Sequence, residues 1–241
     1  MKIIFLTFGD SYRYANSLNR IKKEAETIGW FDEVHACRET DLDKDFYNKY
    51  ARYMHSTRGF GYWIWKSQIV LQHLETCNEG DILVYCDSGC TLNKQGEQRF
   101  KEYITMLSET NEYDNIGFQL EHLEHTWTKG DLLDLYPNLG HTKQLIGGIF
   151  LLKKSGKTIS LIKEWRDLVC SQNFHLVDDS PSRIPNHPSF CENRHDQSCF
   201  SLIRKTRGCI ILEDETWKGD NYEWNHSWIM SKPIHAKRIR G

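Results

Sequence analysis

The sequence predicts an α/β fold built on a central, mostly parallel sheet that is flanked by helices. Short apolar runs alternate with stretches whose apolar residues recur every three or four positions, through about the first 90 residues. This strand-helix-strand-helix-strand rhythm is typical of parallel strands joined by crossover helices. No Pro-, Ser- or Gly-rich linker divides the 241 residues. We therefore expect a single domain, with one half at about 1–90 and the other at about 91–241.

The first half contains three expected strands and three expected helices. The strands lie at residues 1–10, 33–37 and 82–85, and the helices lie at 14–28, 46–54 and 67–77. The third strand is apolar at every position, which predicts burial on both faces of the sheet. Gly29 follows the first helix and is a residue suited to end it.

The second half continues with strands at 115–120, 145–152 and 209–212 and helices at 98–107, 158–169 and 196–205. Residues 171–194 are polar and contain proline, which predicts a long loop of the kind that is often functional. Residues 217–241 are aromatic and basic without a clear period. Gly147 and Gly148 interrupt an expected strand, which indicates either a bulge or the close approach of another group.

The composition argues against several classes of protein. The 31 basic and 33 acidic residues give a formal charge of -2 without a basic block, so we expect no nucleic-acid partner. No stretch reaches the roughly 20 apolar residues of a membrane helix, so we expect no transmembrane segment. The eight cysteines include no Cys-x-x-Cys pair, which favours reduced thiols and a cytoplasmic location.

Three short motifs fail to match common functional patterns. Residues 156–158 resemble the end of a phosphate-binding loop, but the glycine required five positions earlier is Leu151. Residues 58–63 contain two spaced glycines, yet the tyrosine and tryptophan that follow are too bulky for a dinucleotide-binding turn. The histidines and glutamates within 121–125 match no common zinc spacing, which favours a solvated polar segment.

Asp87 follows the strand at 82–85 and is the first candidate functional residue. It stands at the carboxyl end of an expected parallel strand, where α/β folds bind ligands. A carboxylate at such a position can hold a metal ion that in turn binds phosphate. It can equally start a turn before Gly89, as Asp and Gly commonly do.

Asp196 is the second candidate, because it stands where the predicted loop gives way to a helix. It can cap the N-terminus of that helix, an effect of roughly 0.5–2 kcal/mol. A carboxylate at the rim of a cleft can also accept a proton from an attacking hydroxyl. The two roles are compatible.

Three segments in order along the chain, residues 58–66, 83–90 and 194–198, together resemble a group of small glycosyltransferases. These enzymes are similar to those of bacterial polysaccharide clusters and to those of large algal viruses that glycosylate capsid proteins. The resemblance implies the GT-A fold, and it places the protein in the cytoplasm of a cell or of an infected host cell. It also implies that residues 1–90 bind the nucleotide and that residues 91–241 bind the acceptor.

The resemblance implies transfer of a hexosyl or deoxyhexosyl group from a nucleotide diphosphate-sugar, with UDP as the expected nucleotide, to a hydroxyl of a glycan or glycoprotein. In GT-A enzymes the nucleotide sits at the ends of the first strands, which here are Thr7, Phe8, Gly9 and Asp10. Ser88 and Gly89 are expected beside the diphosphate. If transfer inverts the sugar, Asp196 is the expected base, whereas retention would remove the need for one.

The Asp-x-Asp element of this fold holds a divalent ion, and its two acidic positions match Asp87 and Gly89. The second acid is therefore missing. One carboxylate and two phosphates could still hold Mn²⁺ or Mg²⁺, both of which favour oxygen ligands. His235 is the first candidate for a further ligand.

The leaving diphosphate gains negative charge, so basic side chains are candidates to stabilise it. Each of them could instead be a solvated surface charge. The candidates are Arg58, Lys66, Lys237, Arg238 and Arg240. The C-terminal group is favoured, because a mobile basic end could close over a bound diphosphate.

Two other functions compete with transfer. A sugar nucleotidyltransferase would use a related sheet, but no glycine-rich basic loop follows the first strand to hold a triphosphate. A non-catalytic carbohydrate-binding module is consistent with the 8 Trp and 11 Tyr residues.

Overall fold

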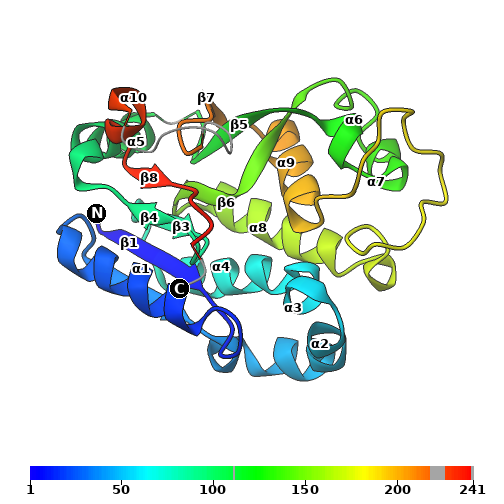
Figure 1. Ribbon diagram of the computed structural model, residues 1–241, viewed down its shortest axis with the longest axis horizontal. Coiled ribbons are helices and arrows are strands. Elements are labelled where there is room, and N and C mark those ends of the chain that lie inside the picture. The colour runs from blue at the N-terminus through cyan, green and yellow to red at the C-terminus, as the bar shows by residue number, and fades with distance from the viewer. Residues whose placement is uncertain (111, 218–225, 240–241) are drawn as a thin grey trace.

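The computed structural model describes residues 1–110, 112–217 and 226–239, and a six-stranded sheet lies at its centre (Figure 1). The strands are β1 (Ile3–Phe8), β2 (Glu33–Cys37), β3 (Ile82–Cys86), β5 (Asn115–Leu123), β6 (Lys143–Lys153) and β7 (Ile210–Glu213). Their spatial order is β2-β1-β3-β6-β5-β7. Neighbours are parallel except for β6, which runs antiparallel to both β3 and β5. The predicted mostly parallel sheet is confirmed.

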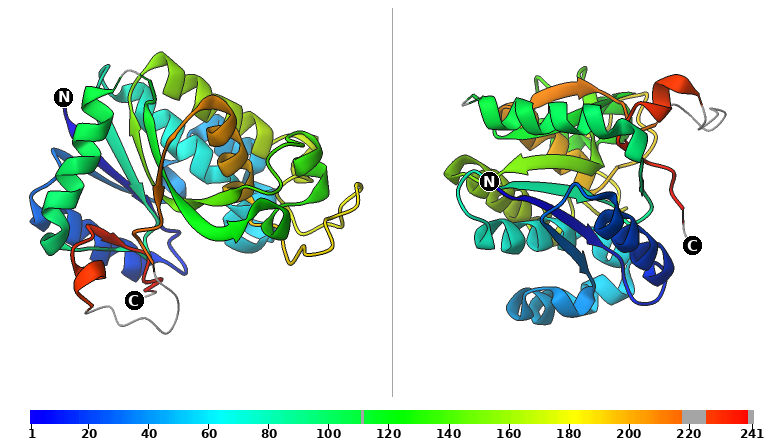
Figure 2. Two further views of the ribbon diagram at one scale, coloured as in Figure 1. Left: turned by 90° about the horizontal axis from the view of Figure 1, so that it is seen from above. Right: turned by 90° about the vertical axis from the view of Figure 1, so that its left-hand side faces the viewer.

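Helices cover both faces of the sheet and create a hydrophobic core on each (Figure 2). Alternate residues of a strand point to opposite faces, so in β3 Leu83 and Tyr85 pack in one core and Ile82 and Val84 in the other. The first core includes residues of α2 (Lys44–Ser56), α4 (Ile64–Thr76), α8 (Gly156–Val169) and α9 (Asp196–Arg207). The second includes residues of α1 (Ala15–Ile28) and α5 (Glu97–Glu109). Burial of β3 on both faces agrees with its apolar sequence.

Short elements that the sequence analysis did not predict complete the fold. They are β4 (Thr91–Leu92), β8 (Ile234–His235), α3 (Arg58–Tyr62), α6 (Glu124–Trp127), α7 (Gly130–Asp134), α10 (Ser227–Met230) and the 3₁₀ helices η1 (Glu39–Asp41), η2 (Lys94–Gly96) and η3 (Gln172–Phe174). β4 pairs antiparallel with β8, so the C-terminal segment lies beside the chain that follows β3. Within the described ranges, no helix has the length and apolar character needed to span a membrane.

The connection between α2 and α4 has a left-handed backbone. Gly59 and Gly61 have φ angles of +61° and +86°, and Phe60 and Trp63 also have positive φ angles, of +50° and +62°. Glycine adopts such angles without a steric penalty, whereas aromatic residues adopt them only when their surroundings hold them there. A Cβ atom on Gly61 would lie 2.8 Å from Met54 Cγ. The turn directs Phe60 and Trp63 toward the cavity described below.

Candidate active site

A cavity of about 500 Å³ opens at the carboxyl ends of β1 and β3. Phe8, Gly9 and Asp10 line it from the β1 side, and Asp87 and Ser88 line it from the β3 side. This is the edge at which open α/β sheets bind their ligands. A larger hollow of about 1080 Å³ lies beside α8, but none of the residues predicted for the site lines it. The cavity at the strand ends is therefore the candidate active site.

Lys66 joins the two acids that the sequence analysis selected. Its Nζ lies 3.1 Å from Asp87 Oδ1 and 3.3 Å from Asp196 Oδ2, and it donates a hydrogen bond of 3.2 Å to the Gly147 carbonyl. The side chains of Lys66 and Asp196 are 3% and 5% exposed, whereas that of Asp87 is 44% exposed. Asp87 thus faces the cavity, and Lys66 and Asp196 lie behind it.

Burial and neighbouring charges set the protonation of this cluster. Burial raises the pKa of Asp196 to about 6, an increase that Asp87 reinforces and Lys66 opposes. Burial lowers the pKa of Lys66, but the two carboxylates outweigh burial and raise it overall. Lys66 therefore stays charged at neutral pH, while Asp196 exchanges its proton near pH 6. A carboxylate that titrates close to neutrality is suited to general base catalysis.

The paired glycines of β6 make room for the side chains around them. A Cβ atom on Gly148 would lie 2.7 Å from Asp87 Oδ2, and one on Gly147 would lie 2.8 Å from the Cβ of Gln197. The register between β5 and β6 also shifts near this point. Close approach and an irregular strand therefore occur together. The Tyr85 hydroxyl also orients Asp87, because it donates a hydrogen bond of 2.9 Å to Asp87 Oδ1.

Of the four predicted nucleotide-binding residues at the end of β1, three line the cavity and one does not. Phe8, Gly9 and Asp10 line the cavity, and the ring of Phe8 stacks on Trp65 with centroids 3.8 Å apart. Thr7 is fully buried and does not line the cavity. Asp10 Oδ1 accepts the backbone N–H groups of the residues two and three positions later, at 3.0 and 2.7 Å. Asp10 therefore fixes the turn into α1 and shapes this wall of the cavity.

The C-terminal segment crosses the chain at Gly89. The backbone N–H of Ile239 donates a hydrogen bond of 3.0 Å to the Gly89 carbonyl, and a Cβ atom on Gly89 would lie 3.2 Å from Arg238 Cα. Ser88, Gly89 and Arg238 all line the cavity, and the Arg238 guanidinium lies 5.7 Å from the ring centre of Trp217. The segment thus covers the position from which the second acid of an Asp-x-Asp pair would project.

The remaining candidates from the sequence lie away from the cavity wall. His235 in β8 is buried, and its Nε2 is 2.8 Å from a backbone carbonyl of α10. Arg58 lies 3.5 Å from Asp179, and neither Arg58 nor Lys237 lines the cavity. Arg240 lies outside the described residues.

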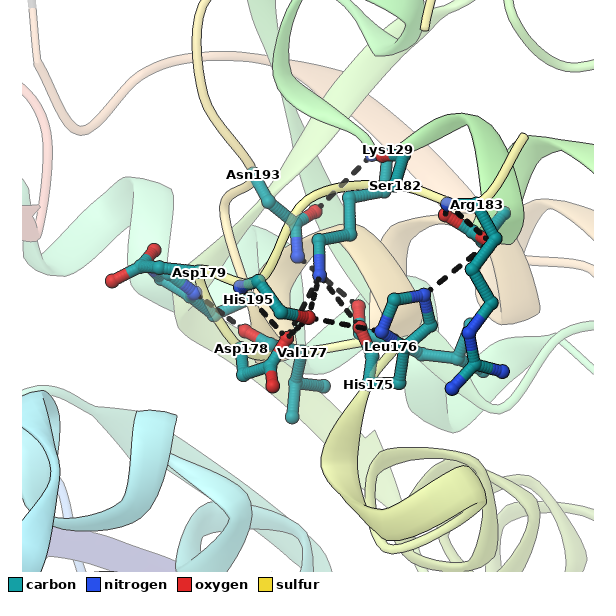
Figure 3. Close-up of polar contacts among 12 residues, drawn as sticks. Lys129, His175, Leu176, Val177, Asp178, Asp179, Ser182, Arg183, Asn193 and His195 are labelled. Atoms are coloured by element: carbon teal, nitrogen blue, oxygen red, sulfur yellow. Dashed lines mark hydrogen bonds and ion pairs between the residues drawn. The ribbon is translucent and has the colours of Figure 1, made fainter. Parts of the chain in front are cut away.

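A buried polar network shapes the loop that leads to α9 (Figure 3). Lys129 Nζ donates to the His175 carbonyl at 2.7 Å and to the Asp178 carboxylate at 2.8 Å. His195 Nδ1 lies 2.6 Å from the Val177 carbonyl, and His195 has a φ angle of +58°. Such a backbone conformation persists only where surrounding contacts hold it. The network therefore fixes the residue immediately before α9, and with it the first side chain of that helix.

Residues that the sequence analysis missed line the far end of the cavity. Trp127 in α6 has the Arg194 guanidinium 4.0 Å from its ring centre. Gln197 accepts a hydrogen bond of 2.9 Å from the Gly147 backbone N–H. Asp214 follows β7, and burial raises its pKa. An acid directly after a strand, the same signal that identified Asp87, could have identified Asp214.

The described residues can hold a divalent cation only together with a bound diphosphate, whose oxygens would supply the missing ligands. Asp87 Oδ1 contacts Tyr85 and Lys66, and Oδ2 has no hydrogen-bond partner among the described residues. Position 89 is glycine, and His235 contacts a backbone carbonyl instead. The described residues contain no group of three or more His, Cys, Asp or Glu side chains placed to hold a metal. One carboxylate with phosphate oxygens and water is nevertheless a common set of Mg²⁺ ligands.

The six-stranded sheet, its flanking helices and the cavity at the strand ends define an α/β fold of the GT-A type. No protein-family model matches the sequence, and comparison with curated proteins finds no significant match. A glycosyltransferase involved in the glycosylation of the major capsid of PBCV-1 has a similar structure, with a TM-score of 0.55, 11% sequence identity, and coverage of 98% of this chain and 92% of that chain. Mouse xyloside xylosyltransferase 1 in its apo form gives a TM-score of 0.50 at 11% identity, covering 97% of this chain and 83% of that chain. The predicted GT-A fold is confirmed.

Proposed function

We propose that this protein is a glycosyltransferase that moves a hexosyl or deoxyhexosyl group from a nucleotide diphosphate-sugar, with UDP as the nucleotide, to a hydroxyl of a glycan or glycoprotein. The observation that carries the proposal is Asp87, a half-exposed carboxylate at the end of β3 in a cavity of about 500 Å³. The similarity of fold to two glycosyltransferases supports it. A cavity of this size fits a ligand as large as a nucleotide-sugar.

In this proposal the nucleotide binds along the wall formed by Phe8, Gly9 and Asp10. The diphosphate lies against Ser88 and Gly89, within reach of Arg238 in the C-terminal segment. Asp87 would hold Mn²⁺ or Mg²⁺ jointly with the diphosphate, and the ion would supply positive charge to the leaving group. Because the described residues offer so few ligands, ion binding should be tight only when the nucleotide is present.

The proposed transfer inverts the sugar. The bond from the sugar C1 to the diphosphate oxygen breaks, the bond from C1 to the acceptor oxygen forms, and the acceptor proton passes to a carboxylate. We assign this carboxylate to Asp196, because its pKa of about 6 leaves it deprotonated at neutral pH. Asp196 lies behind Asp87 with its side chain 5% exposed, so in this proposal the acceptor hydroxyl reaches it at the cavity wall that Asp87 forms.

Thermal unfolding in the presence of nucleotide-sugars tests the function. A matching donor at 100 times its Kd should add about 2.7 kcal/mol to the free energy of unfolding. We expect stabilisation by a UDP-sugar, larger with Mn²⁺ than without it, and loss of the Mn²⁺ increment in Asp87→Ala. No response to any UDP-, GDP- or TDP-sugar would contradict the proposal. A glycan affinity that changes neither on addition of nucleotide nor in Asp87→Ala would instead indicate a carbohydrate-binding module.

The base is tested by comparing Asp196→Asn with Asp214→Asn. Both carboxylates are partly or fully buried, but only Asp214 lines the cavity directly. We expect Asp196→Asn to bind donor normally and to lose transfer, with a fall of about 10²–10⁴-fold in kcat. Asp214→Asn should alter the KM for the acceptor while largely preserving kcat. The reverse result would assign the base to Asp214.

A further inference from the structure

Arg194 is a cation of the cavity wall whose hydrogen-bonding groups are largely unused. It stands two residues before α9, and its guanidinium lies 4.0 Å from the ring centre of Trp127. Its Nε lies 3.5 Å from Oε1 of Glu192, at side-chain exposures of 35% and 48%. In the part of the chain that the structure describes, the guanidinium donates no hydrogen bond. Its two terminal nitrogens are therefore available to a ligand.

The indole ring that supports this guanidinium is fixed to the start of α9. The carbonyl of Trp127 accepts the backbone N–H of Arg194 at 2.9 Å and the hydroxyl of Ser198 at 2.7 Å. At the other end of α6, Glu124 is fully buried and pairs with Lys205 of α9 at 2.7 Å. The ring and the guanidinium are thus held by the same two helices. A planar group that is held in place before a ligand arrives loses less entropy on binding.

Positive charge accumulates around Arg194. Burial lowers the pKa of Arg194, and the nearby Arg238 and Arg58 lower it further, whereas Glu192 opposes the decrease. Arg58 has Asp179 at 3.5 Å, but Arg238 forms no ion pair with any described residue. Arginines stay charged at physiological pH, so their mutual repulsion is not relieved by loss of a proton. A bound anion would relieve it.

The two arginines that line the cavity belong to different ends of it. A Cβ atom on Gly89 would lie 3.2 Å from Arg238 Cα, which places Arg238 beside the proposed diphosphate position. Arg194 instead contacts Trp127 of α6, and its charge lowers the pKa of His122 in β5. Both of these elements come from the half of the chain that is expected to bind the acceptor. The geometry therefore favours the acceptor, and not the diphosphate, as the partner of Arg194.

We propose that the acceptor is a saccharide that carries a carboxylate or phosphate group, and that Arg194 binds this group through its two terminal nitrogens. Trp127 is the positioning residue, because its ring holds the guanidinium in place. Two parallel N–H···O bonds from one guanidinium match the geometry of either oxyanion. The inference rests on the proposed function, since it assigns the substrate class of the same transferase site.

Nuclear magnetic resonance titration of the full chain, saturated with UDP and Mg²⁺, tests the inference with three matched probes. They are methyl glucoside, methyl glucuronide and methyl glucoside 6-phosphate, which differ only at C6. We expect at least one of the two anionic probes to bind about tenfold more tightly than the neutral one. The anion with the larger preference identifies the group as a carboxylate or a phosphate. Equal affinity for all three probes would overturn the inference.

Variants locate the source of this preference. Arg194→Met should abolish it, and Arg194→Lys should lose most of it, because lysine keeps the charge without the planar fork. Trp127→Leu should lower the ratio of anionic to neutral affinity, whereas a merely structural role would weaken both affinities equally. Arg207→Met is the matched control, because Arg207 is 61% exposed, pairs with Glu164 and does not line the cavity. A preference that survives in Arg194→Met, or that falls equally in Arg207→Met, would overturn the inference.

Donor binding separates this inference from the proposed function. Calorimetric titration with UDP should give Arg194→Met the same affinity as wild type. A loss of about tenfold would assign Arg194 to the diphosphate and overturn its role at the acceptor. A preference for UDP-glucuronate over UDP-glucose that disappears in Arg194→Met would place the anionic group on the donor sugar and overturn it as well. Failure of the wild type to bind UDP would contradict the proposed function instead.

Discussion

The two ends of the cavity are built in different ways. The end near β3 takes its charged groups from a strand end and two long helices, and its central cation, Lys66, is 3% exposed. The end near Trp127 takes its groups from a short helix, a long loop and the residues after β7. Its cation, Arg194, pairs across 3.5 Å with Glu192, at side-chain exposures of 35% and 48%. The first end has a buried pair, Lys66 and Asp196, behind the half-exposed Asp87, whereas both charged partners at the second end are partly hydrated.

This difference indicates that the two ends of the cavity have separate roles. Charges that are held without water act strongly on a reacting group, whereas loop residues can change without disturbing the sheet. We expect the end near β3 to support the chemistry common to sugar transfer. We expect the end near Trp127 to select the acceptor. Substitutions at matched positions of the two ends test this expectation.

The largest effect is expected from Lys66→Met. This change leaves the buried carboxylate of Asp196 without its ion pair, and breaking a buried pair in this way costs about 3–5 kcal/mol. The matching change at the other end, Arg194→Met, breaks a hydrated pair worth less than about 1 kcal/mol. Urea unfolding of both variants measures the difference. Similar losses in the two variants would contradict the contrast between the ends.

The next effect is expected from Gly148→Ala, which places a methyl group 2.7 Å from the position of Asp87 Oδ2. Overpacking of this kind costs about 1–3 kcal/mol, and displacement of Asp87 should lower transfer as well. Gly156→Ala is the control, because a Cβ atom there has no neighbour within 4 Å. Urea unfolding and a transfer assay measure both variants. A Gly148→Ala chain with unchanged transfer would show that the Asp87 position is less restricted than the structure indicates.

The regular elements could be predicted because their signals are local. The apolar period of α1 and the stop at Gly29, which has a φ angle of +79°, lie within 16 consecutive residues counting from Tyr14. The strand end at Asp87 is equally local, since an all-apolar run stops at an acid and a glycine. Gly147 and Gly148 were also recognisable, although the sequence alone left open whether a bulge or a neighbour required them.

The assembly of the site could not be predicted, because its contacts join distant segments. Lys66 was expected at the diphosphate, but it lies between Asp87 and Asp196, which are far from it in sequence. The pairing of β4 with β8 rests on two residues in each strand, too few to produce a periodic pattern. Asp214 carried the same local signal as Asp87 after a shorter and less apolar strand.

A smaller, pH-dependent effect should separate Asp196 from the other acids. Burial raises its pKa to about 6, above the value of about 3.9 in an unfolded chain, so the fold binds this proton more tightly. The resulting stabilisation is fully present below about pH 4 and is lost as pH rises through about 6. Asparagine stays neutral, so the free energy of unfolding of Asp196→Asn should improve relative to wild type between pH 4 and 7. A constant difference across this window, measured by urea unfolding, would contradict the raised pKa.

The smallest effect is expected from Gly89→Asp, which restores the missing acid of the Asp-x-Asp pair. A Cβ atom at this position meets Arg238 Cα at 3.2 Å, so the C-terminal segment must shift by a few tenths of an ångström at a cost of about 1 kcal/mol. We expect the shift to move the carboxylate away from the ion, so that Mn²⁺ affinity in the presence of UDP equals that of Gly89→Ala. Electron paramagnetic resonance of free Mn²⁺ measures both affinities. Tighter binding in Gly89→Asp than in Gly89→Ala would show that the segment yields to a second ligand, and that only this one substitution separates the chain from a two-carboxylate site.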